Sequence, residues 1–330
     1  MEKTKKRIDW LDMAKGYGML AVIYAHLYNV GLRSVLYIFH MPLFIFLSGY
    51  TYRVKDNWKT TVINKARRLL IPYIIFGILG GFVDALCNNE INSMTPITIL
   101  VKLLFQRRYL IVWYIMMIFF VEIIMYFPIK YIKNDKKLFV LSATIYIIGR
   151  IYFFFNPKSE WILNIDTCFT CQFWFTLGYL LSKKYVLNNN KIKFNIKVSG
   201  ISFIIMLMCG AINHLITGKN LNIFGNVYAL PLITEIGAIS GILLVISISK
   251  IKTFKFIKFI GTNSLLFMLI HPMIIDILQL LIFKNYIKYL DNLLGAIITF
   301  VITIIFITLL TICYNKFIKN RSKKNYVTEG

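Results

Sequence analysis

Charged side chains are scarce in this sequence, and acidic ones are the scarcest. Asp, Glu, Lys and Arg make up 16% of the 330 residues, against roughly a quarter in a typical soluble domain. Only 14 residues are acidic against 38 Lys and Arg, which gives a formal net charge of +24. A nucleic-acid-binding module would carry such charge on one basic face, whereas these residues form short clusters between apolar runs. The composition therefore argues against a soluble domain and against a nucleic-acid partner.

Several motifs with known chemistry are also missing. Cys168 and Cys171 form a CxxC pair, but the second pair or nearby His that a zinc site needs is absent. The sequence has no Gly-rich phosphate-binding loop and no GxSxG motif. We therefore expect no metal, and neither ATP-driven nor serine-hydrolase chemistry has support.

Long apolar stretches dominate what is present. Hydrophobic residues make up 58% of the chain and aromatic residues 16%. A helix needs about 20 apolar residues to cross a bilayer core. We therefore predict an all-α, polytopic helical membrane protein, a single domain over residues 1–330 with no appended soluble domain. About ten transmembrane helices are expected, near residues 11–30, 35–52, 69–87, 109–127, 137–155, 167–182, 198–217, 225–249, 260–283 and 292–315.

The distribution of basic residues predicts the orientation of these helices. Most of the 38 Lys and Arg lie in alternate segments between the stretches. The positive-inside rule places such segments in the cytosol. Both termini are then cytosolic, which an even number of spans also requires. The segments are 3–7, 53–68, 130–137, 183–197, 250–258 and 316–324.

The first stretch contains titratable residues, which are costly at membrane depth and usually face a polar cavity. Lys15 and His26 are 11 residues apart, which is close to three helical turns, so they share a face about 16 Å apart along the axis. Asp12 lies one turn before Lys15. The next stretch runs back and brings His40 to a depth similar to that of His26. A neutral imidazole is the usual general base, so His26, His40, Lys15 and Asp12 are the candidate catalytic residues.

Structural roles remain open for the same residues. Each histidine would also satisfy a buried backbone carbonyl, and Lys15 with Asp12 would also form an ion pair at the membrane interface. A further group, Lys65, Arg67 and Arg68, lies at the cytosolic end of the third stretch, where three cations suit a phosphate-bearing ligand. Simple positive-inside anchoring is the alternative there. Weaker polar candidates within the stretches are Glu122, Glu235, Asp84, Asp276 and His271.

Several sequence strings resemble the acyltransferase-3 family of membrane acyltransferases, and more narrowly its fucose 4-O-acetylase-like branch. The resemblance runs through nearly the whole chain, and its most specific part is FHMPLF followed by LSGY. The strings are RIDWLDMAKGYGMLAVIYAHLYNV (7–30), FHMPLFIFLSGYTY (39–52), KARRLLIPY (65–73), Trp113-Tyr114, FWFTLGYLL (173–181) and FIGTNSLLFMLIHP (259–272).

The resemblance implies transfer of an acyl group, usually acetyl from acetyl-CoA, to a hydroxyl of a cell-surface or exported glycan. The family's motif of a basic residue, ten intervening residues and then a His corresponds to Lys15 and His26. Lys replaces the more frequent Arg, which keeps the charge but loses the planar fork. His40 matches the FHMP histidine of the branch. Arg67 and Arg68 match the family's basic cluster, which implies contact with the anionic donor.

These residues suggest a mechanism in which acyl-CoA phosphates stay on the basic rim while His26 deprotonates the acceptor hydroxyl. A covalent acyl-imidazole is a variant. The expected partners are acyl-CoA, a glycan or lipid-linked sugar and the lipid bilayer, and the expected location is the bacterial cytoplasmic membrane. A multi-pass transporter or flippase is the main alternative, although no internal repeat supports it. A non-catalytic membrane partner is the third. The sequence leaves open the acyl group, the acceptor and the oligomeric state.

Overall fold

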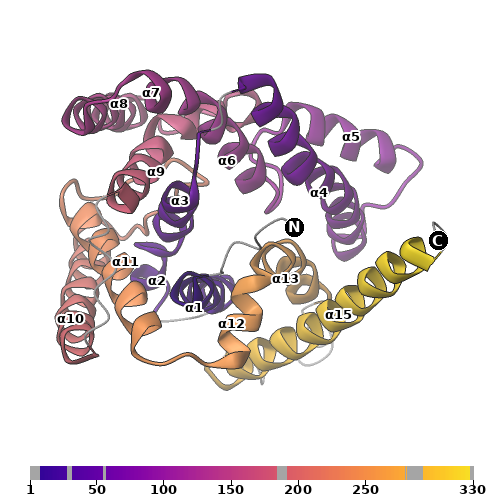
Figure 1. Ribbon diagram of the computed structural model, residues 1–330. Helices are drawn as coiled ribbons and strands as arrows, with labels where there is room; N and C mark the ends of the chain where they lie inside the picture. The colour runs from indigo at the N-terminus through magenta and orange to yellow at the C-terminus, as the bar shows by residue number, and fades with distance from the viewer. Residues whose placement is uncertain are drawn as a thin grey trace.

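The computed structural model describes residues 8–27, 32–54, 57–183, 192–278, 280 and 293–327. This part of the chain is almost entirely helical and contains no β-strand, which confirms the all-α prediction (Figure 1). The helices are α1 (Asp9–Ala25), α2 (Arg33–Tyr37), α3 (His40–Thr51), α4 (Trp58–Cys87), α5 (Thr95–Phe105), α6 (Trp113–Ile124), α7 (Tyr126–Tyr131), α8 (Asp135–Phe155), α9 (Cys168–Lys183), α10 (Ile192–Thr217), α11 (Ile233–Ile251), α12 (Lys255–Thr262), α13 (Ser264–Leu278) and α15 (Leu293–Val327), with the 3-10 helix η1 (Ile162–Thr167) before α9.

Seven helices or continuous helix pairs in the described residues are long and apolar enough to cross a membrane. An eighth is added if α12 and α13, which meet at an angle of 85°, form one broken span. Each of the ten predicted stretches overlaps a helix or helix pair, although residues 28–30, 279, 281–283 and 292 of three stretches lie outside the described part of the chain. However, α1 and α9 have only 17 and 16 residues, fewer than the about 20 that cross a bilayer core. The count of ten and the sides of the termini therefore stay predictions.

The outward faces of the peripheral helices are apolar. Ile71 of α4, Phe154 of α8 and Leu309 of α15 are all more than half exposed. A helix that is hydrophobic on its exposed side as well as its buried side is typical of a membrane span. Lipid therefore accounts for this surface.

Helix α1 lies inside the bundle, where it packs against α3, α11, α12 and α13 (Figure 1). Small residues permit its closest contact. A Cβ on Gly16 would overlap the backbone of Ile257, and one on Gly261 would overlap the carbonyl of Asp12. Small residues at such positions let membrane helices approach closely. Helix α1 is thereby held against α12.

The predicted second span, 35–52, is two helices. Its path breaks at Ile38 and Phe39, so that α2 ends at Tyr37 and α3 begins at His40. His26 follows directly on α1 as its C-terminal cap. Both predicted histidines therefore stand at helix ends on the same side of the bundle.

Helix α5 lies between the predicted spans 69–87 and 109–127, where the sequence predicts only a connection. Its 11 residues begin with a proline in the first turn, a favoured position there because proline needs no backbone donor. At 11 residues α5 is too short to cross a bilayer. It packs against α4 and leads into the loop 106–112.

Candidate functional site

A cavity of about 320 Å³ lies between α1, α2, α3, α4, α6 and α13. The loops 110–112 and 221–224 complete its wall. His26 and His40 both line it, together with the flat side chains of Tyr37, Trp113 and Phe224. The cavity therefore occupies the half of the bundle that the charge distribution predicts to face outward.

The imidazoles of His26 and His40 line this cavity, and that of His271 lies beside His26 without lining it. The ring centroids of His26 and His40 are 6.4 Å apart, and that of His271 lies 5.1 Å from His26. Tyr37 stands 4.9 Å from the His40 ring. His271 is fully buried, and its Nε2 has no hydrogen-bond partner among the described residues. The two histidines expected to lie together do so, and His271, a weaker candidate from the sequence, joins them from α13.

The hydrogen bonds of the three rings define their tautomer. Each Nδ1 lies 2.8–3.0 Å from the backbone carbonyl oxygen four residues earlier in the chain. A carbonyl oxygen only accepts, so each Nδ1 carries the proton, and the neutral ring keeps its lone pair on Nε2. Each histidine thus satisfies a backbone carbonyl, as the structural alternative expected, and Nε2 of each ring still has a lone pair that can accept a proton.

Lys15 and Asp12 lie on the same helix as His26 but do not line the cavity. Asp12 is buried in the contact between α1 and α12, and Lys15 is half-buried. The 11 residues from Lys15 to His26 correspond to about 16 Å of helix. The catalytic roles of Lys15 and Asp12 stay predictions.

The basic cluster of α4 is paired with an acidic residue of another helix, Glu122 of α6. Lys65 Nζ lies 2.6 Å from Glu122 Oε2, and Arg68 lies 3.6 Å from Glu122 Oε1. Glu122 is buried in α6, whereas Arg68 is 63% exposed on its side chain. Arg67 is also exposed. Lys65 and Arg68 are therefore both paired with this carboxylate, and the two arginines are exposed at the surface.

Helix α6 connects this cluster to the cavity. It begins at Trp113 and Tyr114, which line the cavity, and reaches Glu122 about 12–14 Å further along its axis. Tyr114, at the cavity end, is hydrogen-bonded to Ser48 of α3. The arginines and the histidines thus lie at opposite ends of one stretch of the bundle.

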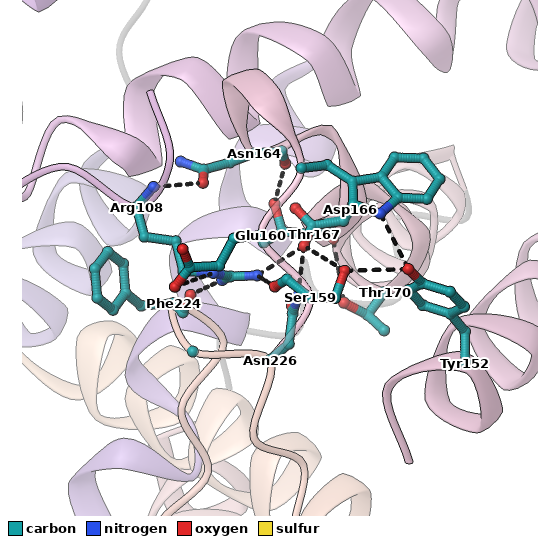
Figure 2. A network of polar contacts seen from close by, with 12 residues as sticks. Arg108, Tyr152, Ser159, Glu160, Asn164, Asp166, Thr167, Thr170, Phe224 and Asn226 are labelled. Atoms are coloured by element: carbon teal, nitrogen blue, oxygen red, sulfur yellow. Dashed lines mark hydrogen bonds and ion pairs between the residues drawn. The ribbon is translucent and has the colours of Figure 1, made fainter. Parts of the chain in front are cut away.

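An ion pair joins three loops, two of which contribute residues to the cavity wall (Figure 2). The guanidinium of Arg108 donates to Asp166 Oδ2 at 2.7 Å and to the backbone carbonyls of Ser159 and Phe224. Asn226 donates to the same Asp166 oxygen at 2.8 Å. We call these five residues the Arg108 cluster. It ties together loop 106–112, loop 156–167 and loop 221–230, two of which form cavity wall.

Backbone conformations in these loops are unusual for residues other than glycine. Arg108, Leu110 and Asn164 have φ angles of 52°, 48° and 54°. The left-handed region costs free energy for such residues and persists where surrounding contacts hold it. Burial raises the pKa of the Asp166 carboxyl, and the neighbouring Arg108 guanidinium opposes that rise. The cluster thus supplies the contacts that keep this part of the cavity wall in place.

We expect Arg108→Ala to lower thermal stability markedly. The Arg108 side chain is 6% exposed and that of Asp166 is fully buried, so the variant leaves an uncompensated buried carboxylate. Breaking a buried pair in this way costs about 3–5 kcal/mol. The melting temperature of the detergent-solubilised protein measures the effect, with Arg107→Ala as control because Arg107 is exposed. Equal melting of the two variants would show that the cluster does not stabilise the fold.

A second, partly buried pair continues this polar network between helices. Arg150 of α8 pairs with Glu235 of α11, to which Tyr146 also donates a hydrogen bond. Arg150 further donates to the backbone carbonyl of Tyr228, whose hydroxyl is bonded to Thr170 of α9. Arg150, like Arg108, therefore stabilises contacts within the fold, and its charge does not bear on the orientation of the helices in the membrane.

The cysteines and carboxylates offer no metal centre in the described part of the chain. No group of three or more His, Cys, Asp or Glu side chains is arranged there to hold a metal ion. Cys168 and Cys171 are both buried free thiols in the first turn of α9.

The fold and cavity define a polytopic helical membrane protein with a histidine-lined site. The chain matches the family model described as an acyltransferase domain over residues 8–312, which is nearly its whole length. The protein therefore belongs to the acyltransferase-3 family and is a multi-pass membrane acyltransferase. No curated protein and no solved structure matches it.

Proposed function

We propose that this acyltransferase moves an acetyl group from acetyl-CoA to a hydroxyl of a cell-surface or exported glycan, or of its lipid-linked precursor. The observation that carries the proposal is that His26 and His40 line one cavity, with His271 beside His26, in a chain of this family. We place the protein in the bacterial cytoplasmic membrane, with the donor arriving from the cytosol and the acceptor from the outer side.

His26 is the general base of the proposed reaction. The acceptor oxygen attacks the thioester carbonyl while its proton passes to Nε2 of His26. The carbon–sulfur bond then breaks, and the CoA thiolate takes up that proton, which leaves an ester and free CoA. The Nδ1 bond to Val22 holds the ring in the tautomer that this step needs. His40 and His271 flank His26 and orient it.

The donor binds through the arginines of α4 in this proposal. Arg67 and Arg68 are exposed cations at the predicted cytosolic face, and Arg offers bidentate contacts to phosphate. Glu122 fixes Lys65 beside them. The acyl-pantetheine arm runs from there along α6 to the histidines.

Replacing both Arg67 and Arg68 by Ala is expected to raise the KM for acetyl-CoA by roughly tenfold or more, because charged hydrogen bonds to phosphate are lost. The kcat should change little, since neither residue lies at the cavity. Initial rates over a range of acetyl-CoA concentrations measure both constants. Lys59→Ala, another exposed cation of α4, is the matched control. An unchanged donor KM in the double variant would contradict this donor site.

The proposal itself is tested with membrane vesicles and acetyl-labelled CoA. Transfer should place label in the glycan fraction as an ester that mild alkali releases as acetate. A transporter of the same architecture would move the sugar and leave it unmodified. Label that never enters the glycan or lipid-linked fraction would contradict the proposed reaction.

A further inference from the structure

We propose that Asp276 recognises the acceptor, and that the acceptor unit is a neutral sugar that bears no carboxylate or phosphate. The inference rests on the proposed function and specifies its substrate class. In this arrangement the Asp276 carboxylate accepts hydrogen bonds from sugar hydroxyls while another hydroxyl of the same unit lies at His26.

Asp276 is placed for this role by α13. It lies five residues after His271, about 7.5 Å along the helix axis, and lines the same cavity beside Met273 and Gly80. Its side chain is half-buried, and it forms no hydrogen bond or ion pair with the residues that the structure describes. A partly buried carboxylate is costly without partners. Ligand hydroxyls directed into the cavity would supply them.

The rest of the cavity wall suits one sugar ring. Aromatic side chains that include Phe44, Phe76 and Trp113 present flat apolar surfaces to it. Small-molecule sites combine such surfaces with a few polar groups that fix orientation. A cavity of about 320 Å³ is near the lower end of the range of about 300–1,000 Å³ for ligand pockets. It therefore encloses a single sugar unit and not an oligosaccharide.

Charge in this region disfavours an anionic acceptor. Asp84 of α4 lies close enough to Asp276 to interact with it electrostatically. No Lys or Arg side chain lines the cavity in the described part of the chain. Arg33, near the cavity, stacks over the Tyr37 ring and donates to the Ala25 carbonyl. A carboxylate or phosphate on the acceptor would thus meet the like charge of Asp276 with no Lys or Arg in the described lining to pair with it, which costs free energy.

The test compares Asp276→Asn with the wild-type protein in vesicles that contain the natural acceptor and receive radiolabelled acetyl-CoA. We expect glycan labelling to fall about tenfold or more, since a hydrogen-bonded charged group is lost. The KM for acetyl-CoA should stay within about twofold, because Asp276 lies at the acceptor end. NMR of the labelled product should place the ester on a neutral sugar.

Two further variants separate recognition from folding. Asp84→Asn removes the neighbouring carboxylate, which does not line the cavity, and should label the glycan at close to the wild-type rate. Asp276→Glu keeps the charge and should retain more transfer than Asp276→Asn. Wild-type labelling by Asp276→Asn, or an ester on a sugar that carries a carboxylate or phosphate, would overturn the inference. Absence of any acetyl-CoA-dependent ester in wild-type vesicles would instead overturn the proposed function.

Discussion

His26→Ala is expected to reduce acyl transfer by about 10²–10⁴-fold, the range over which a positioned general base contributes. The His26 ring lines the cavity, and its Nδ1 bond to Val22 leaves a basic Nε2. Without it the acceptor hydroxyl must lose its proton to water. Initial rates of ester formation in vesicles measure the loss. Protein levels should stay near those of the wild type, because His26 caps the end of α1 and is only partly buried.

The matched control for this variant is His214→Ala. His214 is exposed on α10 and does not line the cavity, so its removal should leave the rate within about twofold. A His26→Ala protein that transfers acetyl at the wild-type rate would refute the assignment of the base. Equal losses in both histidine variants would point to a general effect on the protein and would also refute it.

Gly178→Ala is expected to destabilise the protein by about 1–3 kcal/mol or more, the cost of overpacking a close contact. Helices α3 and α9 touch there, and a Cβ on Gly178 would overlap the carbonyl oxygen of Phe46. Gly49 of α3 meets the carbonyl of Phe175 in the same contact. Backbone atoms cannot move aside as a flexible side chain does. The melting temperature and the yield of monodisperse protein in detergent should both fall.

Gly200→Ala offers a control for Gly178→Ala on another helix. A Cβ on Gly200 would meet no atom within 4 Å, and alanine is the better helix former. Stability should therefore stay equal or rise slightly. If Gly178→Ala and Gly200→Ala have the same melting temperature, the close approach of α3 and α9 does not limit stability.

Much of the helical architecture could be predicted from the sequence because apolar length is a strong constraint in a bilayer. Every predicted stretch overlaps helix within the described residues. The breaks could not be predicted in the same way, since the interruption at Ile38 and Phe39 falls within an unbroken apolar run. The bend between α12 and α13 has a similar origin: it is a matter of packing, which hydropathy does not report.

The proximity of His26 and His40 was predictable because two adjacent helices with a short connection place their facing ends together. His271 lies far away in the sequence, and only the packing of α13 on α1 brings it to them. The sequence feature that makes His271 a candidate is a titratable side chain within an apolar helix, and the same feature applies to Asp276. Such residues are recognisable as candidates, but their partners are set by tertiary contacts.

The basic residues show the same limit. The run that contains Lys65, Arg67 and Arg68 was visible in the sequence, yet the Lys65 pair with Glu122 spans two helices. Arg108 lies outside the basic segments that predict the cytosolic side, and the structure places it in a buried ion pair with Asp166. Charge counts predict orientation, whereas they do not distinguish solvated cations from paired ones.

The most direct test of the central claim is NMR of the surface glycan from a deletion strain complemented with the wild type or with His26→Ala. The account predicts O-acetyl signals with the wild type and their loss with His26→Ala at equal protein levels. That result would identify the esterified position at the same time. The same ester content in the deletion strain and in both complemented strains would contradict acetyl transfer to this glycan by the His26 cavity.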